Sequence, residues 1–217
     1  MSAKTNTNYT VKVIIDECPE NPREAWDNLG TMVCFHSRYK LGDEDHGYNS
    51  RDFSGWDELE REIISDHGDC VILPMYMYDH SGITVNTTGF SSPWDSGQIG
   101  LIFISLKEAR KAYSWKKVTK ARRAHLELML RSEVSLYDSY LQGEVYGYKV
   151  LDAEGEELDS CWGFYGKPET SGLFDEAQSY IDWHIKDARQ KHFAKTKQWI
   201  TSKVNLMYRE PLPKGAY

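Results

Sequence analysis

The sequence predicts a single α+β domain, with an antiparallel or mixed sheet of five to seven strands and helices packed mainly on one face. Three observations lead to this fold class. Short strand patterns fill the first half of the chain, two long helical patterns come late, and regular βα alternation is absent, which disfavours a doubly wound parallel sheet. We expect the domain to cover residues 9–208, between a disordered N-terminus at 1–8 and a flexible tail at 209–217.

Strand patterns occur at seven places along the chain. Residues 9–16 alternate between apolar and polar types, as in a half-buried strand. Nearly continuous apolar runs at 70–78 and 98–105 predict strands that are covered on both faces. Shorter patterns predict the remaining strands at 32–36, 81–88, 145–151 and 157–164, of which the last two should form a hairpin.

Apolar residues at helical spacing predict two long helices late in the chain. The first covers residues 119–141. The second begins at Leu173 and continues for about eight turns, or roughly 45 Å at 1.5 Å per residue. Shorter helical patterns begin near Arg23, Trp56 and Ser105.

Composition indicates an ordered, soluble chain. Its 7 Trp, 14 Tyr and 7 Phe are far more large rings than a disordered polymer carries. The longest apolar stretch, residues 71–77, contains Pro74 and is much shorter than the roughly 20 residues of a membrane span. Residues 1–8 lack the apolar segment of a secretory signal. We therefore expect a cytoplasmic protein without a membrane partner.

Charge is divided unevenly along the chain. Residues 1–106 hold 7 Lys and Arg against 17 Asp and Glu, whereas residues 107–217 hold 19 against 16. Residues 107–123 carry eight basic side chains and one acidic one, a pattern that suits phosphates or an acidic protein surface but is also typical of a solvated helix face. A pI near 5.5 disfavours a dedicated nucleic-acid binder. The candidate binding residues in this run are Lys116, Lys117, Lys120, Arg122 and Arg123.

Reactive side chains gather where two predicted buried strands end and begin. Asp79 and His80 stand at the end of the first strand, and Asp95 precedes the second, so the three converge at one rim of the sheet if the two strands are neighbours. Such a site could support metal-assisted hydrolysis, with Ser96 or Cys161 as helpers. The same residue types also build ordinary turns, so catalysis is the alternative interpretation.

Sequence motifs give no support to a cofactor or metal. The chain lacks a P-loop, a dinucleotide fingerprint and a nucleophile elbow. Its four cysteines are separated by 16, 36 and 91 positions, which is neither a metal knuckle nor a dense disulfide framework. We therefore assign no cofactor and no metal ligands, and expect reduced thiols.

Aromatic residues lie near predicted turns and on the late hairpin. Tyr and Trp beside polar loops favour recognition surfaces, because they combine large contact area with a polar group. Packing between the hairpin and the helices is the other interpretation. The candidate binding aromatics are Trp94, Tyr146, Tyr148 and Trp162.

Five ordered segments between about residues 9 and 166 resemble an uncharacterised family of small proteins encoded by bacteriophages and mobile elements. They are NPR with WDNLG (21–23 and 26–30), YDHSGIT (78–84), PWDSGQIG (93–100), YLQGEVYGY (140–148) and DSCWGFYG (159–166). No activity comes with the family, so the resemblance implies a setting: a phage accessory protein in the cytoplasm of a bacterial host.

The leading hypothesis is a non-enzymatic, phage-encoded binding protein that engages a host or defence macromolecular complex, as an anti-CRISPR-like inhibitor or a host-takeover factor. The missing catalytic motifs, the segregated charge and the aromatics support it. Its acidic first half could imitate phosphate, although a balance of -10 over 106 residues is modest for that role. Direct nucleic-acid binding through residues 116–123 is the less favoured variant.

Overall fold

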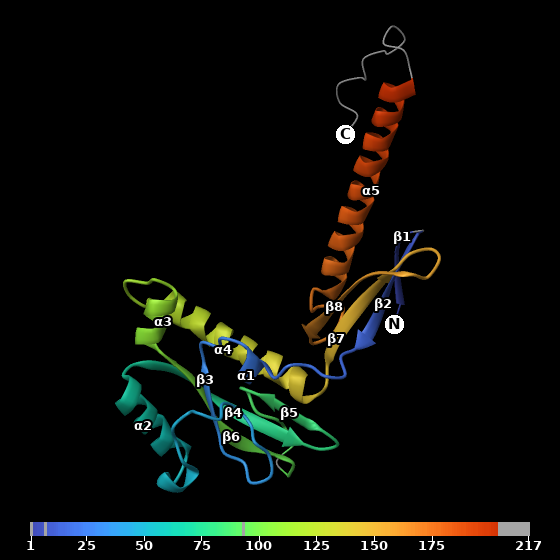
Figure 1. Cartoon of the computed structure of the whole chain (residues 1–217). Coiled ribbons are helices and arrows are strands. Elements are labelled where there is room, and N and C mark those ends of the chain that lie inside the picture. The colour runs from blue at the N-terminus through green and yellow to red at the C-terminus, as the bar shows by residue number, and fades with distance from the viewer. Residues whose placement is uncertain (1, 7, 93, 204–217) are drawn as a thin grey trace. The chain divides into compact units, whose positions relative to one another are not determined.

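The computed structural model describes residues 2–6, 8–92 and 94–203, which belong to two compact units (Figure 1). Unit 2 comprises Ile15–Gly147 and Trp162–Ser171, whereas unit 1 combines the beginning of the chain with Tyr148–Cys161 and the segment from Gly172 onward. The sequence predicts one domain over residues 9–208 instead. Local patterns do not reveal this division, because unit 1 is assembled from three separated segments. The predicted tail at 209–217 lies outside the described residues.

The α+β class is confirmed, but the single sheet of five to seven strands is wrong. The strands of the described residues form two four-stranded sheets, in the orders β1-β2-β7-β8 and β3-β6-β4-β5, and the pairs β1-β2, β3-β6, β4-β5 and β4-β6 are antiparallel. The segment expected to be disordered at 1–8 contains a strand, which pairs with β2. The strands are β1 (Ser2–Asn6), β2 (Tyr9–Ile15), β3 (Thr31–Cys34), β4 (Cys70–Asp79), β5 (Ile83–Asn86), β6 (Ser96–Ser105), β7 (Val145–Leu151) and β8 (Glu157–Tyr165).

Helices cover both faces of the unit 2 sheet, not mainly one as the sequence predicts. Ile102 and Ile104 of β6 pack in one cluster with α4 (Lys120–Leu141), while Leu101 and Phe103 pack in a second cluster with α2 (Trp56–His67). Consecutive side chains of a strand point to opposite faces, so a continuous apolar run needs a cover on each side. Pro74 of β4 is tolerated because β5 pairs only with Tyr76–Asp79, which leaves β4 one neighbour at the proline.

Side-chain caps set the remaining helix boundaries in unit 2. Ser105 accepts a hydrogen bond from the backbone N–H of Glu108 at the start of α3, and Thr119 accepts one from Arg122 at the start of α4. Asn21 caps α1 in the same way. The short helices are α1 (Pro22–Ala25), the 3-10 turn η1 (Ser50–Asp52) and α3 (Leu106–Ala112).

The second sheet holds the first half of α5 (Leu173–Lys203) in unit 1. Leu173, Ala177 and Ile181 are fully buried, and the Tyr180 hydroxyl donates to the Leu158 carbonyl oxygen of β8 at 2.9 Å. Residues 188–199 are exposed throughout, and α5 continues beyond the strands of its unit (Figure 1). Both predicted long helices are therefore confirmed. No helix in the described ranges has the length and apolar character needed to cross a bilayer.

Two glycines of β6 provide a matched test of sheet packing. A Cβ at Gly100 would lie 2.0 Å from the Val33 carbonyl oxygen of β3, whereas a Cβ at Gly97 would meet nothing within 4 Å. We expect Gly100→Ala to lower the free energy of unfolding by at least about 1 kcal/mol. Gly97→Ala should change it by less than about 0.5 kcal/mol. Urea unfolding measures both. Equal effects of the two substitutions would show that β3 does not approach Gly100 this closely.

Candidate functional site

The rim of the unit 2 sheet brings the predicted reactive residues together. Antiparallel pairing places the end of β4 beside the start of β6, and the Asp79 N–H donates to the Asp95 carbonyl oxygen at 2.9 Å. His80 Nδ1 lies 3.8 Å from Asp95 Oδ2, with 65% of the His80 side chain exposed. The two strand ends are therefore neighbours and His80 lies beside Asp95, whereas the Asp79 carboxylate faces Arg38 and Tyr39.

The chemistry of the rim is that of an ion-paired turn. Arg38 and the Tyr39 hydroxyl both donate to Asp79 Oδ2, and the Ser96 hydroxyl donates to the carbonyl oxygen of Ser92. Over the described residues, no three His, Cys, Asp or Glu side chains are grouped so that they could hold a metal ion. Cys161, the other proposed helper, belongs to unit 1. The hydrolase alternative stays a prediction without a complete ligand set.

A second candidate is a basic surface on α3, the following loop and the start of α4. Trp115 links its parts: its ring stacks on Tyr113 at 4.5 Å between centroids, and the Arg122 guanidinium lies 4.7 Å from the Trp115 ring centroid. Glu108, the one acid in this stretch, is engaged by Ser105. We define the basic surface as Lys107, Arg110, Lys111, Lys116, Lys117, Lys120 and Arg122, all exposed except the half-buried Arg122.

Arg123 has a different role from its neighbours. Its guanidinium donates to the Cys70 carbonyl oxygen at 2.8 Å and to Asp69 Oδ1 at 2.6 Å. These bonds fasten the start of α4 to the start of β4. The sequence assigns Arg123 to partner binding because it cannot distinguish a helix residue that faces the sheet from one that faces solvent.

The four candidate aromatics do not form one group. Trp94 is 93% exposed and Trp162 is 45% exposed, whereas Tyr146 is half-buried. Tyr148 is only 2% exposed, and its hydroxyl hydrogen-bonds to Asp159 at 3.1 Å. The prediction that Tyr148 contacts a partner is therefore wrong, because the β7-β8 hairpin turns this ring inward.

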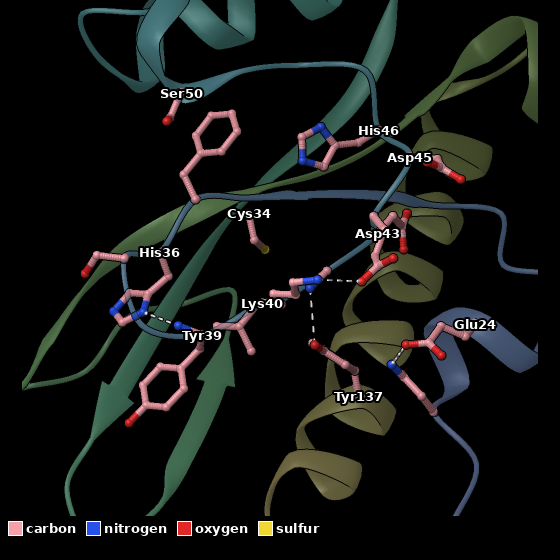
Figure 2. Close-up of a pocket in the computed structure, with 16 residues that line it drawn as sticks. Glu24, Cys34, His36, Tyr39, Lys40, Asp43, Asp45, His46, Ser50 and Tyr137 are labelled. Carbon is pink, nitrogen blue, oxygen red and sulfur yellow. Dashed lines mark hydrogen bonds and ion pairs between the residues drawn. The ribbon is translucent and has the colours of Figure 1, made fainter.

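A polar cavity of about 730 Å³ lies beside β3 and was not predicted. Its walls come from the end of β3, the loop after it, α1 and the Tyr137 position of α4 (Figure 2). The loop residues that line it include Lys40, Glu44 and Asp45. The sequence of the loop after β3 has no periodicity, which predicts an exposed loop. The dense mixture of charged and aromatic types at 35–48 was the one available signal.

Cys34 and His46 of the cavity do not form a thiolate–imidazolium pair. Burial, followed by the charge of Asp43, raises the pKa of the Cys34 thiol to about 12. Burial lowers the pKa of His46, which Asp43 opposes in part. At neutral pH the thiol is protonated and the imidazole is uncharged, so the cavity offers hydrogen-bonding groups and no thiolate.

Cysteine labelling tests this description of Cys34. At pH 8 a thiol with a pKa of about 12 is ionised about a thousandfold less than an ordinary thiol, and only the thiolate reacts. We expect iodoacetamide to modify the exposed Cys18 at least a thousandfold faster than Cys34 in the native protein, as followed by peptide mass spectrometry. In guanidinium chloride the two rates should become similar. Comparable native rates would contradict the buried position.

No protein-family model, curated protein or solved structure matches the chain. The resemblance to phage accessory proteins therefore stays a prediction.

Proposed function

We propose that the protein is a non-enzymatic binding protein that engages an anionic macromolecular partner through the basic surface of unit 2. The observation that carries this proposal is the concentration of seven Lys and Arg side chains on α3, the α3-α4 loop and the first turn of α4. Interfaces of this kind depend on charge complementarity, which speeds association and rejects partners of like charge.

The charge of the remaining protein strengthens the argument. The whole chain has a net charge of -7, so a surface with seven basic groups and one engaged acid differs sharply from its surroundings. Lysines that only maintain solubility need not be grouped in this way. The first turn of α4 also contains no acidic residue, although acids are favoured at helix N-termini. Local positive charge is therefore retained where helix stability favours negative charge.

The stacked rings give the basic surface a fixed centre. Tyr113, Trp115 and Arg122 form a continuous stack, and Arg122 also donates to the Lys117 carbonyl oxygen at 2.7 Å. Trp, Tyr and Arg are enriched in binding hot spots, and Trp and Tyr supply large contact area from two rotatable bonds. A pre-ordered stack lowers the entropy that is lost on binding.

Binding fits the chemistry of the molecule better than catalysis does. The Cys34 thiol is protonated, Asp79 is held by Arg38 and Tyr39, and the described residues provide no three-ligand metal group. We infer from the resemblance to phage proteins that the partner is part of a host or defence complex in a bacterial cytoplasm. The protein would then act as an anti-defence inhibitor or a host-takeover factor.

Charge reversal on the basic surface tests the proposal. The double substitution Lys116→Glu with Lys117→Glu replaces two exposed lysines of the α3-α4 loop with glutamates and changes the net charge by -4. We expect capture of the partner from bacterial host lysate, quantified by mass spectrometry, to fall at least about tenfold, which corresponds to ~1.4 kcal/mol. Capture by the wild-type protein should also weaken as salt is raised.

The matched control is Arg51→Glu with Lys167→Glu, which makes the same charge change at two exposed positions of unit 2 outside the basic surface. It should leave capture unchanged. Two results would contradict the proposal: equal losses in both double variants, or a wild-type protein that retains no partner in stoichiometric amount.

A further inference from the structure

The second half of α5 is an exposed, strongly basic helix. Residues 186–203, here called distal α5, contain six Lys and Arg side chains and one acid, Asp187, a balance of +5. Every basic side chain among them is exposed. Asp187 pairs with Lys191, whose Nζ lies 2.7 Å from Asp187 Oδ2. The basic residues are Lys186, Arg189, Lys191, Lys195, Lys197 and Lys203.

The basic residues have an ordered arrangement around the helix axis. At about 100° per residue, Arg189, His192, Thr196 and Lys203 fall within about 60° of arc on one face. Lysines flank this face on both sides, about 90–130° from its centre. Lys186 and Lys197 lie on one flank, and Lys191 and Lys195 lie on the other.

This arrangement disfavours two other occupants of the helix surface. Self-pairing of distal α5 would bring two segments of +5 charge together, and like charges destabilise such a pair. Insertion into a lipid surface requires a continuous apolar face. Here Arg189 and Lys203 lie in the middle of the face that also carries Phe193, Trp199 and Ile200. The partner must therefore accept cations at the centre and on both flanks.

We propose that distal α5 binds in the major groove of duplex DNA. The groove is about 12 Å wide and admits an α-helix of 10–12 Å diameter, with a phosphate backbone along each side. The two lysine flanks would reach the two backbones. The central face would meet the edges of the base pairs, where arginine pairs with guanine and small apolar groups contact the thymine methyl.

The size and exposure of the segment fit this partner. Eighteen residues at 1.5 Å per residue extend about 27 Å, enough to follow a groove over most of a helical turn of DNA. Phe193 is 46% exposed and Trp199 is 61% exposed, so neither ring is committed to the protein interior. The deep, narrow major groove of duplex RNA would exclude such a helix.

The inference goes beyond the proposed function and does not depend on it. Distal α5 belongs to unit 1 and the basic surface to unit 2, and each contact can fail without the other. The negative charge of the rest of the chain opposes DNA binding, so we expect micromolar affinity that falls steeply with salt. With about five phosphate contacts, the slope of log K against log salt should be about -4 to -5.

Fluorescence anisotropy with a labelled 24-base-pair DNA duplex, from 50 to 200 mM salt, tests the proposal. The double substitution Lys195→Gln with Lys197→Gln removes one lysine from each flank. Both positions are exposed, and glutamine favours the helix about as well as lysine does. We expect at least a tenfold loss of affinity at 50 mM salt and a slope reduced in size by about 2. Circular dichroism should show unchanged helix content.

The matched control, Arg51→Gln with Lys167→Gln, removes the same charge at two exposed positions outside both distal α5 and the basic surface and should leave the slope unchanged. Single-stranded DNA and duplex RNA should bind several-fold more weakly than duplex DNA. The proposal is overturned by absence of binding at 50 mM salt, or by a slope that falls equally in the control variant. Equal or tighter binding of single strands, duplex RNA or polyglutamate overturns it as well, and polyglutamate binding would indicate an acidic protein partner.

Discussion

The guanidinium of Arg23 joins parts of unit 2 that sheet pairing does not connect. It donates to both oxygens of Asp43 at 2.7 and 2.8 Å, to Glu133 of α4 at 2.8 Å and to the Gly30 carbonyl oxygen at 2.6 Å. Its side chain is only 2% exposed. Burial alone would lower the pKa of Arg23, but its hydrogen bonds and charge attraction to Asp43 and Glu133 outweigh burial and raise it. Arg23 therefore stays charged, and both carboxylates are compensated.

The surfaces that we associate with function in unit 2 depend on this ion cluster. Asp43 also accepts a hydrogen bond from the backbone N–H of Met32 at 2.9 Å, and this bond satisfies a backbone group on the open edge of β3. The Asp43 side chain is one of those that line the polar cavity. Three contacts hold α4 in place. Its start is held by Arg123, which bonds to Cys70, and its middle by Glu133, which bonds to Arg23. Near the end of α4, Asp138 accepts a hydrogen bond from the backbone N–H of Val85 in β5. Because α4 is held at three points, the basic surface at its start is presented on a rigid element.

The elements that could be predicted from sequence are those whose signal is local. Continuous apolar runs predicted β4 and β6, and helical periodicity predicted α4 and α5. Asp79 and Asp95 could be placed at one rim because the end of one antiparallel strand lies beside the start of its neighbour. Strand partners are a nonlocal choice, so the division into two sheets was missed. The burial of Tyr148 and the bonds of Arg23 depend equally on distant contacts, since Asp43 and Glu133 lie 20 and 110 positions from Arg23.

Urea unfolding of Arg23→Met, compared with the exposed Arg51→Met, tests the central role of the ion cluster most directly. Removing Arg23 leaves two largely buried carboxylates uncompensated, so the free energy of unfolding should fall by about 3–5 kcal/mol. The Arg51 substitution should change it by less than about 0.5 kcal/mol. A loss below about 1 kcal/mol for Arg23→Met, the value typical of a surface ion pair, would contradict the account.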